Sequence, residues 1–203
     1  MAEGHRMKTA KLVQRGLWLE YVTLGWNVVG VGIVAWAAVL ARSVALAGFG
    51  LDSLIEIVAS VVVVWQLRGS NAHRERTALR LIASAFGVLV VYIVGQLVVT
   101  LLTRTHPQPS AGGVVWLALT LVTMLLLATG KRVTGNQLGN AVLQTEGRVT
   151  LVDAYLAGAV LLGLLLNALL GWWWADPLAG LVIVYYGVKE ARHAWQEATA
   201  EET

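Results

Sequence analysis

The chain has 203 residues, of which 57% are hydrophobic and only 13% are charged, and its mean hydropathy is +0.68. A soluble domain of this size could not bury so much apolar surface, so the composition excludes a soluble fold and indicates an integral membrane protein. The net charge of +3 is small, and the absence of cysteine excludes disulfides, thiolate metal ligands and cysteine redox chemistry.

Six apolar segments are close to the length that crosses a bilayer as a helix. About 20 apolar residues span roughly 30 Å of hydrocarbon. The segments are 17–40, 43–67, 79–102, 114–129, 141–170 and 175–188. We therefore predict an all-α integral membrane protein with six transmembrane helices. Its expected parts are a basic N-terminal segment (1–16), a six-helix domain (17–190) and a short tail (191–203).

The ends of the later segments carry helix and loop signals. Asp176 and Pro177 predict the start of the sixth helix, with aspartate as N-cap and proline at the first helical position. The three tryptophans at 172–174 are typical of the aromatic belt at a membrane–water interface. Residues 131–140, which include Gly135 and Gly139, are expected to form a polar loop between the fourth and fifth helices.

Lysine and arginine are distributed asymmetrically about the predicted spans. Of the 15 such residues, all but Arg42 and Arg104 fall on one side, which the positive-inside rule assigns to the cytoplasm. Both termini are therefore predicted to be cytoplasmic, and no cleavable signal peptide is expected because the first 16 residues are polar and basic. The same asymmetry explains the pI of about 9.4, and attraction to anionic lipid headgroups is a by-product of it. The basic pI therefore gives no support to nucleic-acid binding.

Two carboxylates lie within the second predicted span. Asp52 and Glu56 are four residues apart, which places both on one helix face, about 13 Å and 20 Å from the outer end of the span. Asp153 lies about 18 Å from the cytoplasmic start of the fifth span, at a similar depth. Ionisable groups at this depth are costly and mark ion, proton or charge-pair sites. We expect these three side chains to converge near the middle of the membrane.

Further polar residues extend this acidic site. Glu146, Thr150 and Asp153 share one face of the fifth helix, with Glu146 on the cytoplasmic approach. Glu20 and Asn27 are seven residues apart on the first span and are candidates for a secondary part of the pathway. Lysine and arginine are expected to be absent at this depth. A divalent cation or bound protons must then supply the positive charge.

Each of these residues also has a purely structural interpretation. Asp52 and Glu56 could form a structural pair that is hydrogen-bonded to Ser53, Ser60 or a polar group of a neighbouring helix. Glu146 could be a helix-start acid near the positive end of the helix dipole. Glu20 could pair with Arg15, and Asn27 could bond between helices. The histidines at 5, 73, 106 and 193 lie at chain ends or in loops, where a solvated side chain is the simpler interpretation.

Three motifs resemble the cation diffusion facilitator family. SVALAGFGLDSLIE (43–56) is similar to that family's second-helix signature, with its two acids spaced by four. EGRVTLVD (146–153) resembles the partner motif, in which a histidine follows the first acid by three positions; Val149 stands there instead. WADPLAGL (174–181) resembles the start of the family's sixth helix. The chain is most similar to a membrane-only branch without the cytoplasmic C-terminal domain, like the vesicular transmembrane zinc-binding proteins.

The resemblance implies a homodimer that exports a divalent cation from the cytosol by alternating access in exchange for protons. It implies Asp52, Glu56, Asp153 and Glu146 as metal ligands, and it makes His73 a candidate for extra metal binding. Zinc is the first candidate substrate, with manganese and iron as alternatives. Without the histidine, the remaining carboxylate oxygens suit harder ions better. In a prokaryote, the membrane would be the plasma (inner) membrane.

Two other classes of function remain open at this point. A membrane zinc sensor or accessory subunit would bind metal without transporting it. An enzyme is not expected. GFGLD (48–52) superficially resembles the glycine-flanked aspartate of intramembrane aspartyl proteases. However, the aspartate is displaced by one residue, the Tyr-Asp partner is missing, and Glu56 would be unexplained.

Overall fold

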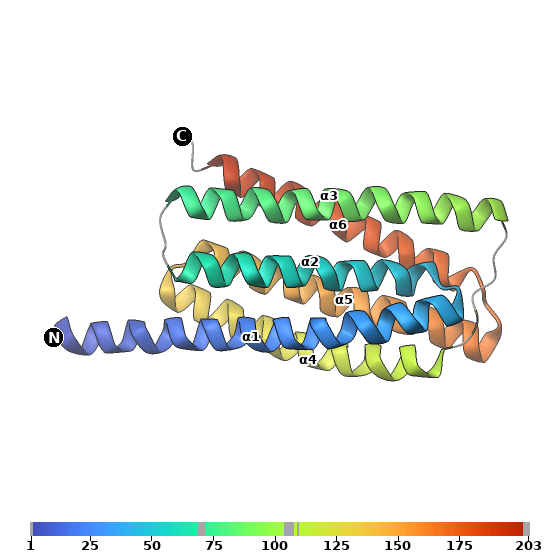
Figure 1. The fold of residues 1–203 in the computed structure, drawn as a ribbon, viewed down its shortest axis with the longest axis horizontal. Helices are drawn as coiled ribbons and strands as arrows, with labels where there is room; N and C mark the ends of the chain where they lie inside the picture. The colour runs from blue at the N-terminus through green and yellow to red at the C-terminus, as the bar shows by residue number, and fades with distance from the viewer. Residues whose placement is uncertain (1, 69–71, 104–107, 109, 201–203) are drawn as a thin grey trace.

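The fold is a bundle of six helices in the computed structural model, which describes residues 2–68, 72–103, 108 and 110–200. The helices are α1 (Ala2–Ala41), α2 (Val44–Leu67), α3 (Ala72–Thr103), α4 (Ala111–Leu138), α5 (Ala141–Leu170) and α6 (Ala175–Ala200). Strands are absent from these residues. The first turn of α1 and the last turn of α6 lie at the same end of the bundle (Figure 1). The prediction of an all-α, six-helix membrane protein is confirmed.

Five of the helices are long and apolar enough to cross a membrane: Thr9–Ala41, Val44–Leu67, Arg76–Thr103, Ala111–Leu138 and Ala141–Leu170. The helix α6 falls outside this group because its second half carries charged residues, among them Lys189, Glu190 and Arg192. The predicted sixth span, 175–188, is therefore the apolar first half of a longer helix, Ala175–Ala200, whose second half is polar.

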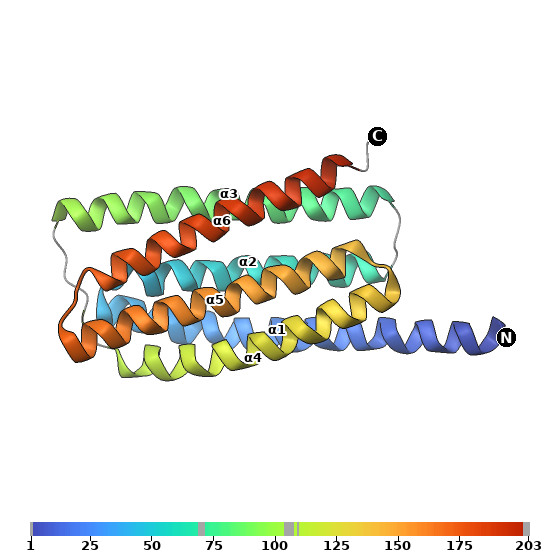
Figure 2. The ribbon, with the colours of Figure 1, turned by 180° about the vertical axis from the view of Figure 1, so that it is seen from behind.

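The helices α2 and α5 form the centre of the bundle. In Figures 1 and 2, α3 and α6 lie along one side and α1 and α4 along the other, with α2 and α5 between them. Helix α2 contacts α1, α3, α5 and α6, and α5 contacts α2, α4 and α6. More of the apolar stretch is buried in α2 and α5 than in the other three spans. Polar side chains on these two helices are thus the best shielded from lipid and water.

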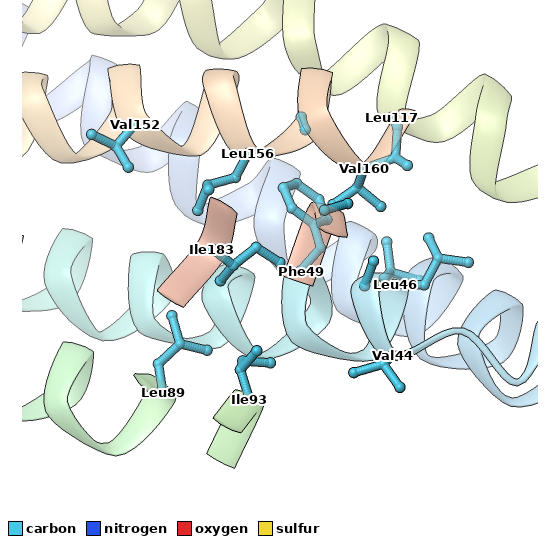
Figure 3. Close-up of a cluster of buried hydrophobic side chains, with 14 of the residues drawn as sticks. Val44, Leu46, Phe49, Leu89, Ile93, Leu117, Val152, Leu156, Val160 and Ile183 are labelled. Carbon is cyan, nitrogen blue, oxygen red and sulfur yellow. The ribbon is translucent and has the colours of Figure 1, made fainter. Parts of the chain in front are cut away.

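A hydrophobic cluster joins the two central helices to their neighbours. Phe49 of α2 packs among side chains from α5, α3 and α6, including Leu156, Ile93 and Ile183, and these four residues are essentially inaccessible to solvent (Figure 3). Phe49 and Leu156 lie on the outer side of Asp52 and Asp153 along their helices. Apolar side chains therefore fill the space between the central carboxylates and the outer end of the bundle.

The start of α6 differs from the prediction. The helix begins at Ala175, so Asp176 lies inside the first turn and does not cap its own helix. Its buried carboxylate accepts hydrogen bonds from the Ser43 hydroxyl and from the Ala45 backbone N–H at 3.2 Å. Ser43 is itself the N-cap of α2 and accepts from Leu46 N at 3.0 Å. Asp176 thus satisfies the free N–H groups of a neighbouring helix.

The predicted polar loop at 131–140 is also wrong. Helix α4 continues to Leu138, and the connection to α5 is only Gly139, in the left-handed conformation (φ 62°), and Asn140, the N-cap of α5. Buried residues recur along α4 at intervals of three or four up to its last turns, which is the period of a helix packed on one face. They include Leu117, Thr120, Met124, Leu127, Lys131 and Thr134.

Candidate metal centre

Asp52 of α2 and Asp153 of α5 meet inside the bundle. Their side chains are only 4% and 2% exposed, and their carboxyl groups lie within hydrogen-bonding reach of each other. Within the described chain, Oδ2 of Asp52 and both carboxylate oxygens of Asp153 lack a hydrogen-bond partner. The matched depths of the two residues thus correctly predict their meeting. Buried acceptors without donors are unfavourable unless a cation or proton joins them.

Glu56 lies one turn of α2 further toward the cytoplasmic end. Its Oε1 accepts a hydrogen bond of 2.6 Å from the hydroxyl of Thr150 on α5. The same oxygen is 3.8 Å from the ammonium nitrogen of Lys131, which is an ion-pair distance but too long for a hydrogen bond. Glu56 thus contacts both α5, through Thr150, and α4, through Lys131. Thr150 is a polar group of a neighbouring helix, which is one of the structural partners considered for Glu56.

Lys131 is the main correction to the sequence-based site. It is fully buried, and its Nζ donates hydrogen bonds of 3.0 Å to both Glu146 Oε1 and Thr150 Oγ1. Glu20 Oε2 lies 3.1 Å from the same nitrogen. The expectation that lysine is absent at this depth is therefore wrong. One ammonium from α4 is shared by carboxylates from α1, α2 and α5, which we call the lysine cluster: Lys131, Glu20, Glu56 and Glu146.

Two glycines allow Lys131 to reach these partners. A Cβ atom at Gly147 of α5 would lie 2.7 Å from Cγ and 2.9 Å from the backbone nitrogen of Arg132 on α4. At Gly135, a Cβ would lie 2.9 Å from the backbone nitrogen of Gln144. These distances are shorter than van der Waals contact, so the backbones of α4 and α5 approach closely only because both positions lack a side chain.

The residues of α1 have different positions from those expected. Glu20 is fully buried in the lysine cluster, so the alternative pairing with Arg15 is wrong. Asn27 is also buried, but its Nδ2 donates to the carbonyl oxygen of Thr23 in its own helix, at 3.1 Å. The contacts of the described residues do not connect Asn27 to Asp52 or Glu56. Its membership in the pathway stays a prediction.

The metal-binding potential is concentrated in the aspartate pair. Across the described residues, no three Asp, Glu or His side chains are placed to hold one ion. A third oxygen would come from Glu56 if it left Thr150. Val149, at the position of the family's histidine, is 3% exposed and packs in the hydrophobic core, so it offers no ligand. Ligation by Asp52, Glu56, Asp153 and Glu146 stays a prediction.

His193 lies apart from this centre. His193 Nε2 is 3.5 Å from Glu197 Oε1 in the polar half of α6, and Glu197 also binds Arg148 and Thr145. His106 lies outside the described residues, as do the side chains of His5 and His73. The predictions made for those three histidines therefore stay predictions.

Comparison with known proteins identifies the family. The model of the cation efflux transmembrane domain matches residues 21–201. The chain belongs to the cation efflux family. This family transports divalent metal cations. The matched segment contains Asp52, Glu56, Lys131 and Asp153, and it begins one residue after Glu20.

The chain is also similar to a curated transmembrane protein. This cation efflux family member is 25% identical over 187 residues to Transmembrane protein 163 from Xenopus laevis. The aligned region covers 87% of this chain and 66% of that protein, so the chain spans about two thirds of the length of its curated relative.

Proposed function

We propose that this chain exports a divalent cation from the cytosol across the membrane in exchange for protons, as a homodimer. Zinc is the first candidate, with manganese and iron as alternatives. The observation that supports this most strongly is the pair of buried carboxylates at Asp52 and Asp153, whose oxygens lack donors within the described chain. A divalent cation would satisfy these oxygens and offset their mutual repulsion.

The ion would be held by oxygen atoms alone. Asp52 and Asp153 would bind it first, and Glu56 would complete the set when its carboxylate turns from Thr150 toward the aspartates. Carboxylates bind zinc, but a site without imidazole favours zinc less strongly over manganese or iron. Glu146 lies about 8 Å from the cytoplasmic start of α5, where it would meet an ion before Asp153 does.

Export requires two access states and a coupling. The apolar cluster around Phe49 fills the outer side of the aspartate pair, so release to the outside requires the helices to separate there. Relative tilting of helix groups about a midplane site is the usual means in transporters. Protons and metal compete for the same carboxylate oxygens, and this competition would link cation exit to proton entry.

Cation flux into proteoliposomes tests the proposal. Asp52→Asn and Asp153→Asn each keep the side-chain size and remove a charge, so zinc- or manganese-dependent flux should fall at least tenfold. Glu190→Gln is the matched control, because Glu190 is also buried but has His193, Arg148 and Lys189 as its neighbouring cationic groups. Flux normalised to reconstituted protein should remain in the control. Unchanged flux in both site variants would refute export through this pair.

A second candidate is a membrane metal sensor or accessory subunit. The lysine cluster favours it, because one ammonium ties α1, α2, α4 and α5 together and opposes their separation. This function predicts metal binding that is lost in Asp52→Asn, together with the absence of flux in the native protein. Calorimetry and flux on the same preparation separate the two functions.

A further inference from the structure

The lysine cluster has more negative than positive groups. Glu20, Glu56 and Glu146 come from three different helices and share the single ammonium of Lys131. A simple structural ion pair needs one carboxylate for one ammonium. Here Glu20 Oε1 and Glu146 Oε2 are buried and lack a hydrogen-bond partner among the described residues. These oxygens are buried acceptors that the ammonium leaves without a donor.

The position of the cluster places it on the ion's path. Along α5, Glu146 lies about 8 Å and Asp153 about 18 Å from the cytoplasmic start of the helix. Along α2, Glu56 follows Asp52 by one turn in the cytoplasmic direction. An ion that comes from the cytosol to the aspartate pair therefore reaches the carboxylates around Lys131 first.

The four contacts of the ammonium are unequal. Lys131 Nζ donates hydrogen bonds of 3.0 Å to Glu146 and Thr150, and it forms an ion pair with Glu20 Oε2 at 3.1 Å. Glu56 is 3.8 Å away and is held by Thr150 instead. Of the three carboxylates, Glu56 is the farthest from the ammonium, so its departure breaks the weakest ion pair of the cluster. It is also the one that can reach toward Asp52 on its own helix.

We propose that Lys131 is a tethered cation that fills a second divalent-cation position, formed by Glu20, Glu56 and Glu146. It limits each protomer to one divalent cation, bound at the aspartate pair. An arriving ion takes Glu56 from the cluster, while Lys131 keeps Glu20 and Glu146. The inference rests on the proposed function for its ion, and it adds a residue that sets how many ions bind and where.

Calorimetry on the full chain in lipid nanodiscs tests this, with Mn²⁺ or Zn²⁺ alone as the probe. Lys131→Met removes the charge and keeps a long side chain, so the number of ions bound per protomer should rise from one to two. Lys131→Arg keeps the charge and should still bind one. Lys189→Met, which removes an exposed lysine of α6, is the matched control. An unchanged stoichiometry and Kd in Lys131→Met would overturn the proposal.

A second variant keeps the test valid if Lys131→Met folds poorly. In the triple variant Glu20→Gln, Lys131→Met, Glu146→Gln, all three substituted side chains are neutral, and Glu56 is the only carboxylate left in the cluster. This variant should therefore bind one ion, as the native protein does. If Lys131→Met is unstable without metal, Mn²⁺ should restore its melting temperature to within a few degrees of native. Failure of both Mn²⁺ and Zn²⁺ to restore it would overturn the proposal.

The aspartate variants separate this inference from the proposed function. Asp52→Asn combined with Lys131→Met should bind one ion in the lysine cluster, while Asp52→Asn alone should bind none. If the native protein binds no ion and Lys131→Met binds one, the proposed function fails and the tethered cation stands. If both bind one ion that Asp52→Asn abolishes, the tethered cation fails and the proposed function stands.

Discussion

Removal of the Lys131 ammonium should destabilise the metal-free bundle. In Lys131→Met, the buried carboxylates of Glu20 and Glu146 lose their cation, and Thr150 loses a hydrogen-bond donor. Removal of one partner from a buried ion pair costs about 3–5 kcal/mol, because an uncompensated charge remains. We therefore expect the free energy of unfolding to fall by about 3–5 kcal/mol in chelator-treated protein.

A second variant distinguishes a loss of stability caused by uncompensated charge from one caused by altered packing. The triple variant with Glu20→Gln and Glu146→Gln removes those charges with the ammonium, so its loss should stay below about 1 kcal/mol. Denaturant unfolding in mixed micelles, followed by the fluorescence of the nine tryptophans, measures both values. The reasoning is refuted if the single variant loses less than about 1 kcal/mol, or if the triple variant is as unstable as the single one.

Three further predictions follow from the helix contacts. Gly147→Ala should lower the melting temperature through overpacking of about 1–3 kcal/mol against α4, whereas Gly158→Ala, with its nearest neighbour at 3.7 Å, should not. Asp176→Asn should speed amide hydrogen exchange at Ala45; unchanged exchange would contradict its capping of α2. Burial raises the pKa of Glu190, beyond the predicted sixth span, above 4.5. Burial disfavours only the ionised carboxylate, so the folded protein carries no such penalty below about pH 4.5. The penalty appears, and stability falls, as the pH rises through the raised pKa. Glu190→Gln should therefore stabilise the protein at pH 8 and much less at pH 4, as melting curves would show.

The depth of the acidic residues within the bundle could be predicted from the sequence because an α-helix rises by a constant distance per residue. Once the ends of α2 and α5 are approximately known, Asp52 and Asp153 must lie at similar levels. Their inward direction follows from the cost of a carboxylate in lipid. The family motifs around the same residues agree with this physical argument, and the matched domain model covers both.

Lys131 and Asp176 show why other parts could not be predicted. Lys131 lies in a polar stretch whose composition indicates a loop, but packing of α4 on α5 extends the helix and turns this residue inward. Its partners are far away in sequence, and only the tertiary fold brings them to it. Asp176 carries the local signal of an N-cap, yet it caps α2. Capping rules consider one helix at a time, so they do not see a cap supplied by a neighbour.

The link between Asp176 and the start of α2 gives the bundle a pivot. It fastens α2 to α6 at their outer ends through Ser43 and Ala45. Helix α2 has 24 residues and is about 36 Å long, so a swing of about 10° around this fastening would carry its far end about 6 Å. A lever of this kind magnifies a small rotation at one face of the membrane into a wide displacement at the other.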